Sequence, residues 1–220
     1  MTSRENFLKY LKGKNVCLVG PAPSIKQLGD QSDLIDSYDV VVRINKALPV
    51  PESIVHCSGA KTDILYNCLN DDPESGGYLH IPYLENEIDW LVCPYPNKSP
   101  FFIDIKKFIS MNNERVNFCH FDLEYYNKLE LEMGTRPNSG VLAILDLLSA
   151  DIKSLHITGI TFFRGGYISE YRDYSEKQVL KRMRNHGNHK QEPQLKYIKN
   201  ILKNSNITTY DRFLEEIINE

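Results

Sequence analysis

Residues 16–24, with the sequence VCLVGPAPS, determine the fold class of this chain. The first four residues form a continuous apolar run, which is typical of a β-strand covered on both faces. The run ends at Gly20, and a helical stretch follows Ser24. Because ligands bind where parallel strands end and helices begin, Gly20 would let a ligand approach the backbone, and Ser24 would cap the helix or touch phosphate. An ordinary strand–helix turn would look the same.

Six further short apolar runs follow along the chain, and amphipathic helical patterns lie between several of them. These helical patterns cover 101–111, 139–148 and 195–202. Strands that alternate with helices indicate an α/β fold. We therefore predict a Rossmann-like domain with a mainly parallel sheet of about seven strands and helices on both faces. The predicted strands are 16–20, 39–44, 63–67, 90–93, 116–119, 155–160 and 206–210.

No internal repeat and no linker rich in Pro, Gly or Ser divides the chain, so we predict a single domain over residues 1–220. Two stretches have the composition of loops. Residues 70–77 (NDDPESGG) are turn-rich, and residues 164–189 are polar and rich in Tyr, Arg and His. Ordered loops of such length usually carry function, so we expect 164–189 to act as a lid over the site.

Composition excludes several classes of protein. Apolar residues make up 41% and charged residues 25% of the chain, which is the mixture of a globular domain and not of a disordered or collagen-like one. With 26 Lys and Arg against 29 Asp and Glu, the net charge is −3, so we expect no nucleic-acid partner. The sum hides a basic stretch, because residues 177–203 hold eight Lys or Arg and a single acid.

The sequence also predicts the compartment. No apolar run approaches the ~20 residues that cross a bilayer, and the first residues lack the apolar core of a signal peptide. The five cysteines are odd in number and have no C-x-x-C spacing, which predicts neither a disulfide framework nor a zinc site. We therefore expect no transmembrane segment and a cytoplasmic protein, either free or peripheral at the inner face of the membrane.

Polar side chains follow the second and third predicted strands. Asn45 comes just after the run 39–44, and alternation along a strand places it on the same face as Arg43. Asn67 ends the next run. An Asn side chain offers both a donor and an acceptor, which suits ribose or phosphate. Two such residues at neighbouring strand ends indicate one cleft, although each alone is an ordinary loop residue.

The sharpest local signal is residues 134–141, GTRPNSGV, directly before a strongly amphipathic helix. Ser139 stands where an N-cap would, and Gly140 would let a ligand approach closely. Free N–H groups at the start of a helix favour an anion such as carboxylate or phosphate. Helix capping without any ligand is the alternative interpretation.

A last cluster combines aromatic, basic and imidazole side chains. Tyr167, Tyr171 and Tyr174 precede His186 and His189, and all lie in or beside the basic stretch. No carboxylate pair follows a strand, and no His or Cys spacing suits a metal, so we expect no metal and no cofactor. Tyr hydroxyls, basic side chains and backbone N–H groups would then stabilise a leaving phosphate.

These segments, in this order, resemble the sialyltransferases. The similarity is closest to the small bacterial enzymes that use CMP-sialic acid, and the sialylmotifs of the animal-type family are also recognisable. Residues 16–46 and 59–67 resemble the long sialylmotif, 136–160 the short one, and 189–202 the late His motif. The resemblance implies a GT-A-like sialyltransferase variant that moves sialic acid from a CMP-sugar donor to a glycan acceptor hydroxyl, with inversion and without metal.

The resemblance also implies roles for individual residues. His189 would be the general base, Arg136 would organise substrate at the mouth of the site, and Tyr167 would donate to the leaving phosphate. Asn45 and Asn67 would contact the ribose and phosphate. The donor-binding set that we expect is Gly20, Ser24, Asn45, Asn67, Asn138, Ser139, Gly140, Tyr171 and His186. The expected partners are a CMP-linked nucleotide sugar and a glycan; a homo-oligomer stays open.

Three positions depart from the family pattern: Pro21 replaces an Asn, Thr161 an acid, and Phe163 a Tyr or His. Two alternatives therefore stay open, namely a CMP-Kdo or other nucleotide-sugar transferase and a catalytically impaired nucleotide-binding relative. A methyltransferase or dehydrogenase is weaker, because no glycine fingerprint follows the first strand and no acid ends the second. Residues 134–160 contain no Cys, so the disulfide that joins the two sialylmotifs in animal-type members is excluded.

Overall fold

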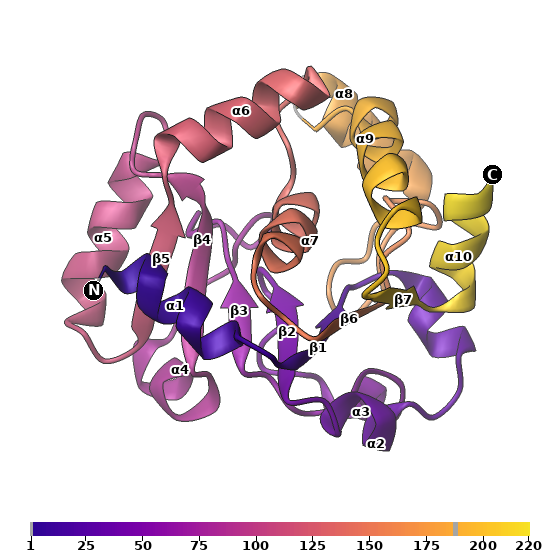
Figure 1. Ribbon diagram of the computed structural model, residues 1–220, viewed down its shortest axis with the longest axis horizontal. Helices are drawn as coiled ribbons and strands as arrows, with labels where there is room; N and C mark the ends of the chain where they lie inside the picture. Colours follow the sequence, from indigo (N-terminus) through magenta and orange to yellow (C-terminus); the bar gives the residue numbers. More distant parts are fainter. Residues whose placement is uncertain (1, 187–188) are drawn as a thin grey trace.

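The computed structural model describes residues 2–186 and 189–220 and arranges them around a seven-stranded sheet (Figure 1). The strand order is β5-β4-β3-β2-β1-β6-β7, and every neighbouring pair is parallel. This confirms the predicted Rossmann-like α/β fold. The strands are β1 (Asn15–Val19), β2 (Val40–Ile44), β3 (Ile64–Tyr66), β4 (Trp90–Pro96), β5 (Asn117–Phe121), β6 (Ser154–Thr158) and β7 (Thr208–Tyr210).

Helices connect the strands, as parallel pairing requires. The predicted helices at 101–111, 139–148 and 195–202 correspond to α5, α7 and α9. The helices are α1 (Ser3–Leu11), η1 (Pro23–Gln27), α2 (Ser32–Asp36), α3 (Glu52–Ser58), α4 (Ile81–Glu87), α5 (Phe102–Asn112), α6 (Leu123–Met133), α7 (Ser139–Ser149), α8 (Glu176–His186), α9 (Gln191–Lys203) and α10 (Arg212–Asn219).

Both faces of the sheet are covered, and β1 shows how. Val16 and Leu18 point into the larger core, under α1 and α7, whereas Cys17 and Val19 point into a smaller core under η1, α2 and α3. Figure 1 shows α1 passing in front of β4 and β5. A strand buried on both faces must be apolar at every position, which explains the continuous run that the sequence displays.

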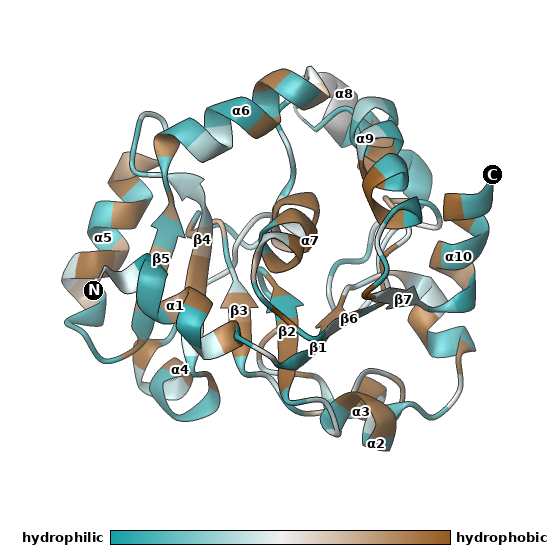
Figure 2. Ribbon diagram, viewed as in Figure 1, coloured by the Kyte–Doolittle hydropathy of each residue, from teal (hydrophilic) through white to brown (hydrophobic). Residues whose placement is uncertain are grey.

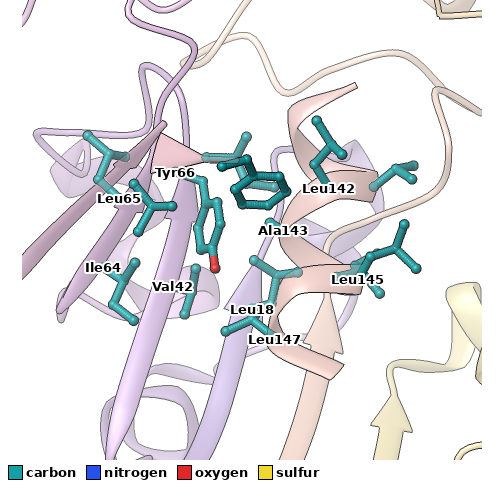
Figure 3. Packing of buried hydrophobic residues seen from close by; sticks show 14 of the residues in the cluster. Leu18, Val42, Ile64, Leu65, Tyr66, Leu142, Ala143, Leu145 and Leu147 are labelled. Carbon is teal, nitrogen blue, oxygen red and sulfur yellow. The ribbon is translucent and has the colours of Figure 1, made fainter. Parts of the chain in front are cut away.

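Helix α7 is the most buried helix and is apolar along nearly its whole length (Figure 2). Its side chains meet those of β1, β2 and β3, and the ring of Tyr66 stands between sheet and helix (Figure 3). A polar contact locks this packing: the fully buried Asp146 accepts hydrogen bonds from the Tyr66 hydroxyl (2.7 Å) and from Arg4 Nη1 (2.9 Å). Loss of a partner would leave the buried carboxylate of Asp146 uncompensated, which is destabilising.

The strand order reverses at β1, and two glycines meet there at the carboxyl ends of β1 and β6. A Cβ on Gly20 would lie 2.4 Å from the carbonyl oxygen of Gly159. A Cβ on Gly159 would in turn lie 2.4 Å from the carbonyl oxygen of Gly20, and Gly159 has a φ of +66°. Only glycine at both positions allows the two backbones to approach so closely. This crevice outside reversing strand ends is the usual ligand site of open α/β sheets.

The segment 164–189, expected as a loop, differs from the prediction. Residues 164–175 form neither helix nor strand, but α8 begins at Glu176. Its residues are good helix formers, and Val179 is buried at 3% exposure, so helix propensity and one packed apolar side chain decide the local structure. The high polarity of the segment concealed this signal. Its role as a lid stays a prediction.

We expect Gly159→Ala to lower the free energy of unfolding by about 2–4 kcal/mol, because it combines a strained φ with a backbone clash. Gly13→Ala is the matched control. Gly13 has a φ of +70°, but no atom lies within 4 Å of the place that an alanine Cβ would take, so this variant isolates the cost of φ, about 1 kcal/mol. Urea unfolding of both variants measures the difference, and equal losses would show that the close approach at β1 and β6 is unimportant.

Candidate functional site

A cavity of about 550 Å³ opens at the carboxyl edge of the sheet, beside the point where the strand order reverses. Its wall is built from strand ends, from the start of α7 and from the segment that precedes α8. Eight of the residues predicted for the site line this one cavity, although they come from segments far apart in the sequence. They are Asn45, Arg136, Asn138, Ser139, Gly140, Tyr167, Tyr171 and His189.

Asn45 lies just beyond β2 and links it to the end of β3. Its backbone N–H donates to the Tyr66 carbonyl (2.6 Å), and its Oδ1 accepts from the Cys68 N–H (3.1 Å). With a φ of +54°, Asn45 leaves the strand geometry, so the expected alternation with Arg43 does not extend to it. Arg43 is instead buried and donates to carbonyl oxygens, including that of Ser58 (2.8 Å).

The start of α7 forms one wall of the cavity. The sequence predicted Ser139 as the N-cap, but the N-cap is Asn138. The Asn138 backbone is extended, and its Oδ1 accepts from the Val141 N–H (2.9 Å). The Ser139 Oγ is therefore not used for capping and lies 3.5 Å from the Tyr95 hydroxyl. A helix start with a hydroxyl beside it that takes no part in capping is suited to a carboxylate or phosphate.

Arg136 is held against aromatic rings. Its guanidinium carbon lies 4.6 Å from the ring centre of Phe101 and 5.2 Å from that of Tyr95. The Nε is buried and has no hydrogen-bond partner among the described residues. Stacking of this kind positions a guanidinium without neutralising its charge, so Arg136 can attract an anionic group.

His189 lies next to Arg136, and its ring is oriented by the backbone. Its Nδ1 is 3.0 Å from the Arg136 carbonyl oxygen. Because a carbonyl only accepts, Nδ1 carries the hydrogen of the neutral ring and Nε2 is the nitrogen left to accept; the Pro137 backbone carbonyl also hydrogen-bonds the ring. Burial, and then the charge of Arg136, lowers the pKa of His189 to about 4. The imidazole is therefore neutral at pH 7 and able to take a proton through Nε2.

The segment before α8 supplies an aromatic wall. The rings of Tyr167 and Tyr171 lie 5.3 Å apart between their centres, and the Arg172 guanidinium lies over both. Burial is the main cause that raises the pKa of both tyrosines. Their hydroxyls consequently stay protonated at neutral pH, and that of Tyr171 is hydrogen-bonded with the Asn45 side chain.

Comparison with known proteins adds to this geometry. No family model and no curated protein matches the chain. A mammalian sialyltransferase solved with Gal-β-1-3GalNAc-ortho-nitrophenol superposes with a TM-score of 0.58 and 19% identity, over 92% of this chain and 71% of that one. The sialyltransferase CstII from Campylobacter jejuni, solved with CMP-3FNeuAc, superposes with a TM-score of 0.58 and 17% identity, over 90% and 80%.

The chain has a sialyltransferase-like fold. A CstII complex with a trisaccharide acceptor and CMP superposes similarly, with a TM-score of 0.56 and 18% identity, over 93% of this chain and 84% of that one. The expected likeness in fold is thus confirmed. Identities this low establish the fold alone, so the roles of individual residues stay predictions.

Three predicted residues of this sialyltransferase-like fold do not line the cavity. Asn67 is fully buried; its Nδ2 donates to the Gly76 carbonyl (2.9 Å) and its Oδ1 accepts from the Leu69 N–H (2.7 Å), so it holds the turn 70–77. Gly20 packs against β6, and Ser24 is buried within η1, while their neighbours Pro21 and Ala22 reach the cavity. The side chain of His186 lies outside the described residues.

Sequence reasoning missed Tyr95 and Arg172, which also line the cavity. The predicted strand 90–93 stopped before two prolines, because proline removes a backbone donor from a ladder. In the structure β4 continues through Pro96, with an irregular register against β5, and carries Tyr95 to the site. Arg172 had no signal beyond its place among three tyrosines.

Among residues 2–186 and 189–220, which the structure describes, no helix is both long and apolar enough to cross a membrane. Within the same residues, no group of three or more His, Cys, Asp and Glu is placed to hold a metal ion. The expected metal independence stays a prediction.

We expect His189 to lower the folding stability of the protein at acidic pH. Its folded pKa of about 4 lies below the unfolded value near 6.5, so the unfolded chain binds the additional proton between these limits. Stability should fall as the pH is lowered through this window, by about 2–3 kcal/mol from pH 7 to pH 4.5. Urea unfolding should show that His189→Gln removes this loss, whereas His56→Gln, which removes an exposed imidazole, is the matched control. Equal acid sensitivity of wild type and His189→Gln would contradict the assignment.

Proposed function

We propose that this protein is an inverting glycosyltransferase that moves an acidic sugar, sialic acid, from a CMP-linked donor to a glycan hydroxyl. One observation carries the proposal. A neutral imidazole, an arginine on aromatic rings, a helix start and a row of tyrosines all line one cavity. The solved structures of like fold include complexes with CMP, with CMP-3FNeuAc and with a trisaccharide acceptor.

In the proposed reaction, His189 acts as the general base. Its Nε2 accepts the proton of the acceptor hydroxyl, whose oxygen forms a bond to the anomeric carbon of the donor sugar. The bond between that carbon and the phosphate oxygen breaks on the opposite face, and CMP leaves with the electron pair. The proton then passes from His189 to solvent. The imidazole is neutral at pH 7 and therefore ready to accept this proton, although its low pKa also makes it a weak base.

The remaining residues bind and orient. Arg136 lies next to His189 and would hold an anionic group of the substrates close to the reacting carbon. Ser139 and the start of α7 would bind donor oxygens, and the Tyr167 hydroxyl would donate to the leaving phosphate. Together these groups would stabilise the charge that separates in an oxocarbenium-like transition state.

A nucleotide-binding relative without transfer activity is the second candidate. Pro21 lines the cavity without a backbone N–H, and both polar ends of Asn67 are occupied by the turn 70–77. Two donor contacts that the family resemblance implies are therefore not offered by these side chains.

Several expectations stay predictions beside this proposal. They are a single domain over 1–220, a lid formed by 164–189, and a location in a reducing cytoplasm. The five cysteines are free in the structure. A homo-oligomer also stays open.

We expect wild-type protein to bind CMP in calorimetric titration and to hydrolyse or transfer sugar from a CMP-linked donor. Assays with CMP-sialic acid and with CMP-Kdo would identify the donor, because both carry the same nucleotide and an anionic sugar. CMP binding without turnover of either donor would favour the second candidate. Absence of CMP binding would exclude the proposed function.

We expect His189→Gln to lower kcat by about 10²–10⁴-fold, the usual contribution of a positioned general base, while CMP affinity stays within about twofold. Lys190→Gln is a matched control, since it changes the exposed neighbour that does not line the cavity. Full transfer activity of His189→Gln would show that another group takes the proton.

A further inference from the structure

A second cationic centre lies in the cavity, apart from Arg136. Arg172 and Arg182 both line the wall beside the tyrosines, and both contact Glu74. Arg182 Nη1 is 2.9 Å from the Glu74 Oε2, and Arg172 Nη2 donates to the Glu74 backbone carbonyl. The two arginines come from the segment before α8 and from α8 itself, whereas Glu74 comes from the turn 70–77.

Arg172 is desolvated but incompletely partnered. Its side chain is only 11% exposed, and its guanidinium carbon lies 5.1–5.9 Å from the ring centres of Tyr167, Tyr171 and Tyr174. Its Nε is buried and makes no hydrogen bond within the described residues, since the nearest carboxylate oxygen, Glu74 Oε2, is 4.0 Å away. A buried guanidinium N–H without an acceptor is costly, so this position favours an anionic ligand.

The Glu74 carboxylate reaches solvent, although it is held by a hydrogen bond from the Tyr174 hydroxyl as well as by Arg182. Its side chain is 39% exposed, and its turn is held independently, because the Glu74 N–H donates to Asp72 Oδ1 (2.9 Å) and Asn67 binds the Gly76 carbonyl. An exposed ion pair of this kind contributes little to stability. The carboxylate can therefore move into solvent without unfolding the turn.

Positive charge outweighs negative charge around this centre. Lys46 lies 5.6 Å from the ring centre of Tyr171, and burial, followed by repulsion from Arg172, lowers its pKa. Lys46, Arg172 and Arg182 face two carboxylates, those of Asp72 and Glu74. When the Glu74 carboxylate leaves, the two arginines of the cavity wall, with Lys46 near them but outside the lining, face the Asp72 carboxylate, and this net positive charge suits a phosphate group.

We propose that Arg172 and Arg182 bind the phosphate of the donor nucleotide and that Glu74 is the internal counterion which the phosphate displaces. The inference rests on the proposed function and deepens it. A CMP-linked acidic sugar carries two anionic groups, a phosphate and a carboxylate. The cavity offers two arginines on separate sets of aromatic rings, so Arg172 takes the phosphate beside Tyr167 and Arg136 takes the carboxylate beside His189.

The test compares the binding of CMP with that of cytidine, because the ratio of the two affinities measures the contribution of the phosphate. In calorimetric titration, Arg172→Ala should weaken CMP binding by about 10–100-fold and change cytidine binding by less than about twofold. Arg172→Lys keeps the positive charge but loses the planar pair of guanidinium donors, so it should give an intermediate loss of CMP affinity. Glu74→Gln should tighten CMP binding by about 3–10-fold and leave cytidine unchanged, because the competing charge is gone.

Glu85→Gln is the matched control for Glu74→Gln. Glu85 pairs with Arg115 on the surface at similar exposure, away from the cavity. It should leave both affinities unchanged. Thermal unfolding of each variant checks folding, and a folded Glu74→Gln variant with an unchanged or lower ratio of CMP to cytidine affinity overturns the inference even if Arg172→Ala fails to fold.

Further ligands separate this inference from the proposed function. If substitution of Arg172 leaves the CMP affinity unchanged, the inference is overturned and the proposed function is not affected. Binding of AMP or UMP but not CMP, with the same dependence on Arg172, supports the phosphate site and excludes the CMP donor. Free N-acetylneuraminate that competes at Arg172 and not at Arg136 would reverse the two assignments and overturn the inference, as would a wild-type protein that binds no phosphorylated ligand.

Discussion

The contact between the backbones of Gly20 and Gly159 is the constraint on which the site depends. It brings the carboxyl ends of β1 and β6 within a distance that no side chain tolerates at either position. Beyond this point the chain continues through Pro21 and Ala22 toward η1 and, after β6, through residues 160–163, and both segments line the cavity. A larger residue at either position would separate the strand ends and widen the floor of the site.

A second constraint positions the opposite wall. The buried carboxylate of Asp146 ties α7 to Tyr66 on β3 and to Arg4 on α1, so the helix cannot slide along the sheet. Its first turn, capped by Asn138, is thereby held at the cavity, and the Asn138 N–H also donates to Gln194 Oε1 of α9 (2.8 Å). Rigid packing in the core thus fixes the geometry of the polar groups that a donor would meet.

Charge in the cavity is organised by aromatic rings more than by ion pairs. Arg136 rests on Tyr95 and Phe101, and Arg172 rests on the tyrosines that precede α8. Rings hold a guanidinium in place while leaving its N–H groups for a ligand. Several of the chain's 13 tyrosines therefore serve to hold arginines, and the net charge of −3 conceals two local cationic centres.

The parallel α/β sheet could be predicted from the amino-acid order alone, because strands buried on both faces must be apolar at every position and so stand out as short runs such as 16–19. Most of the cavity was indicated in the same way, since polar residues at strand ends and at the start of a helix converge in this fold. Three features emerged only from the folded chain. The Asn67 side chain hydrogen-bonds the turn 70–77, Tyr95 reaches the site on a strand that contains prolines, and Arg172 contacts Glu74. The last of these contacts joins residues about a hundred positions apart, and local sequence carries no record of which distant side chain will satisfy a buried polar group.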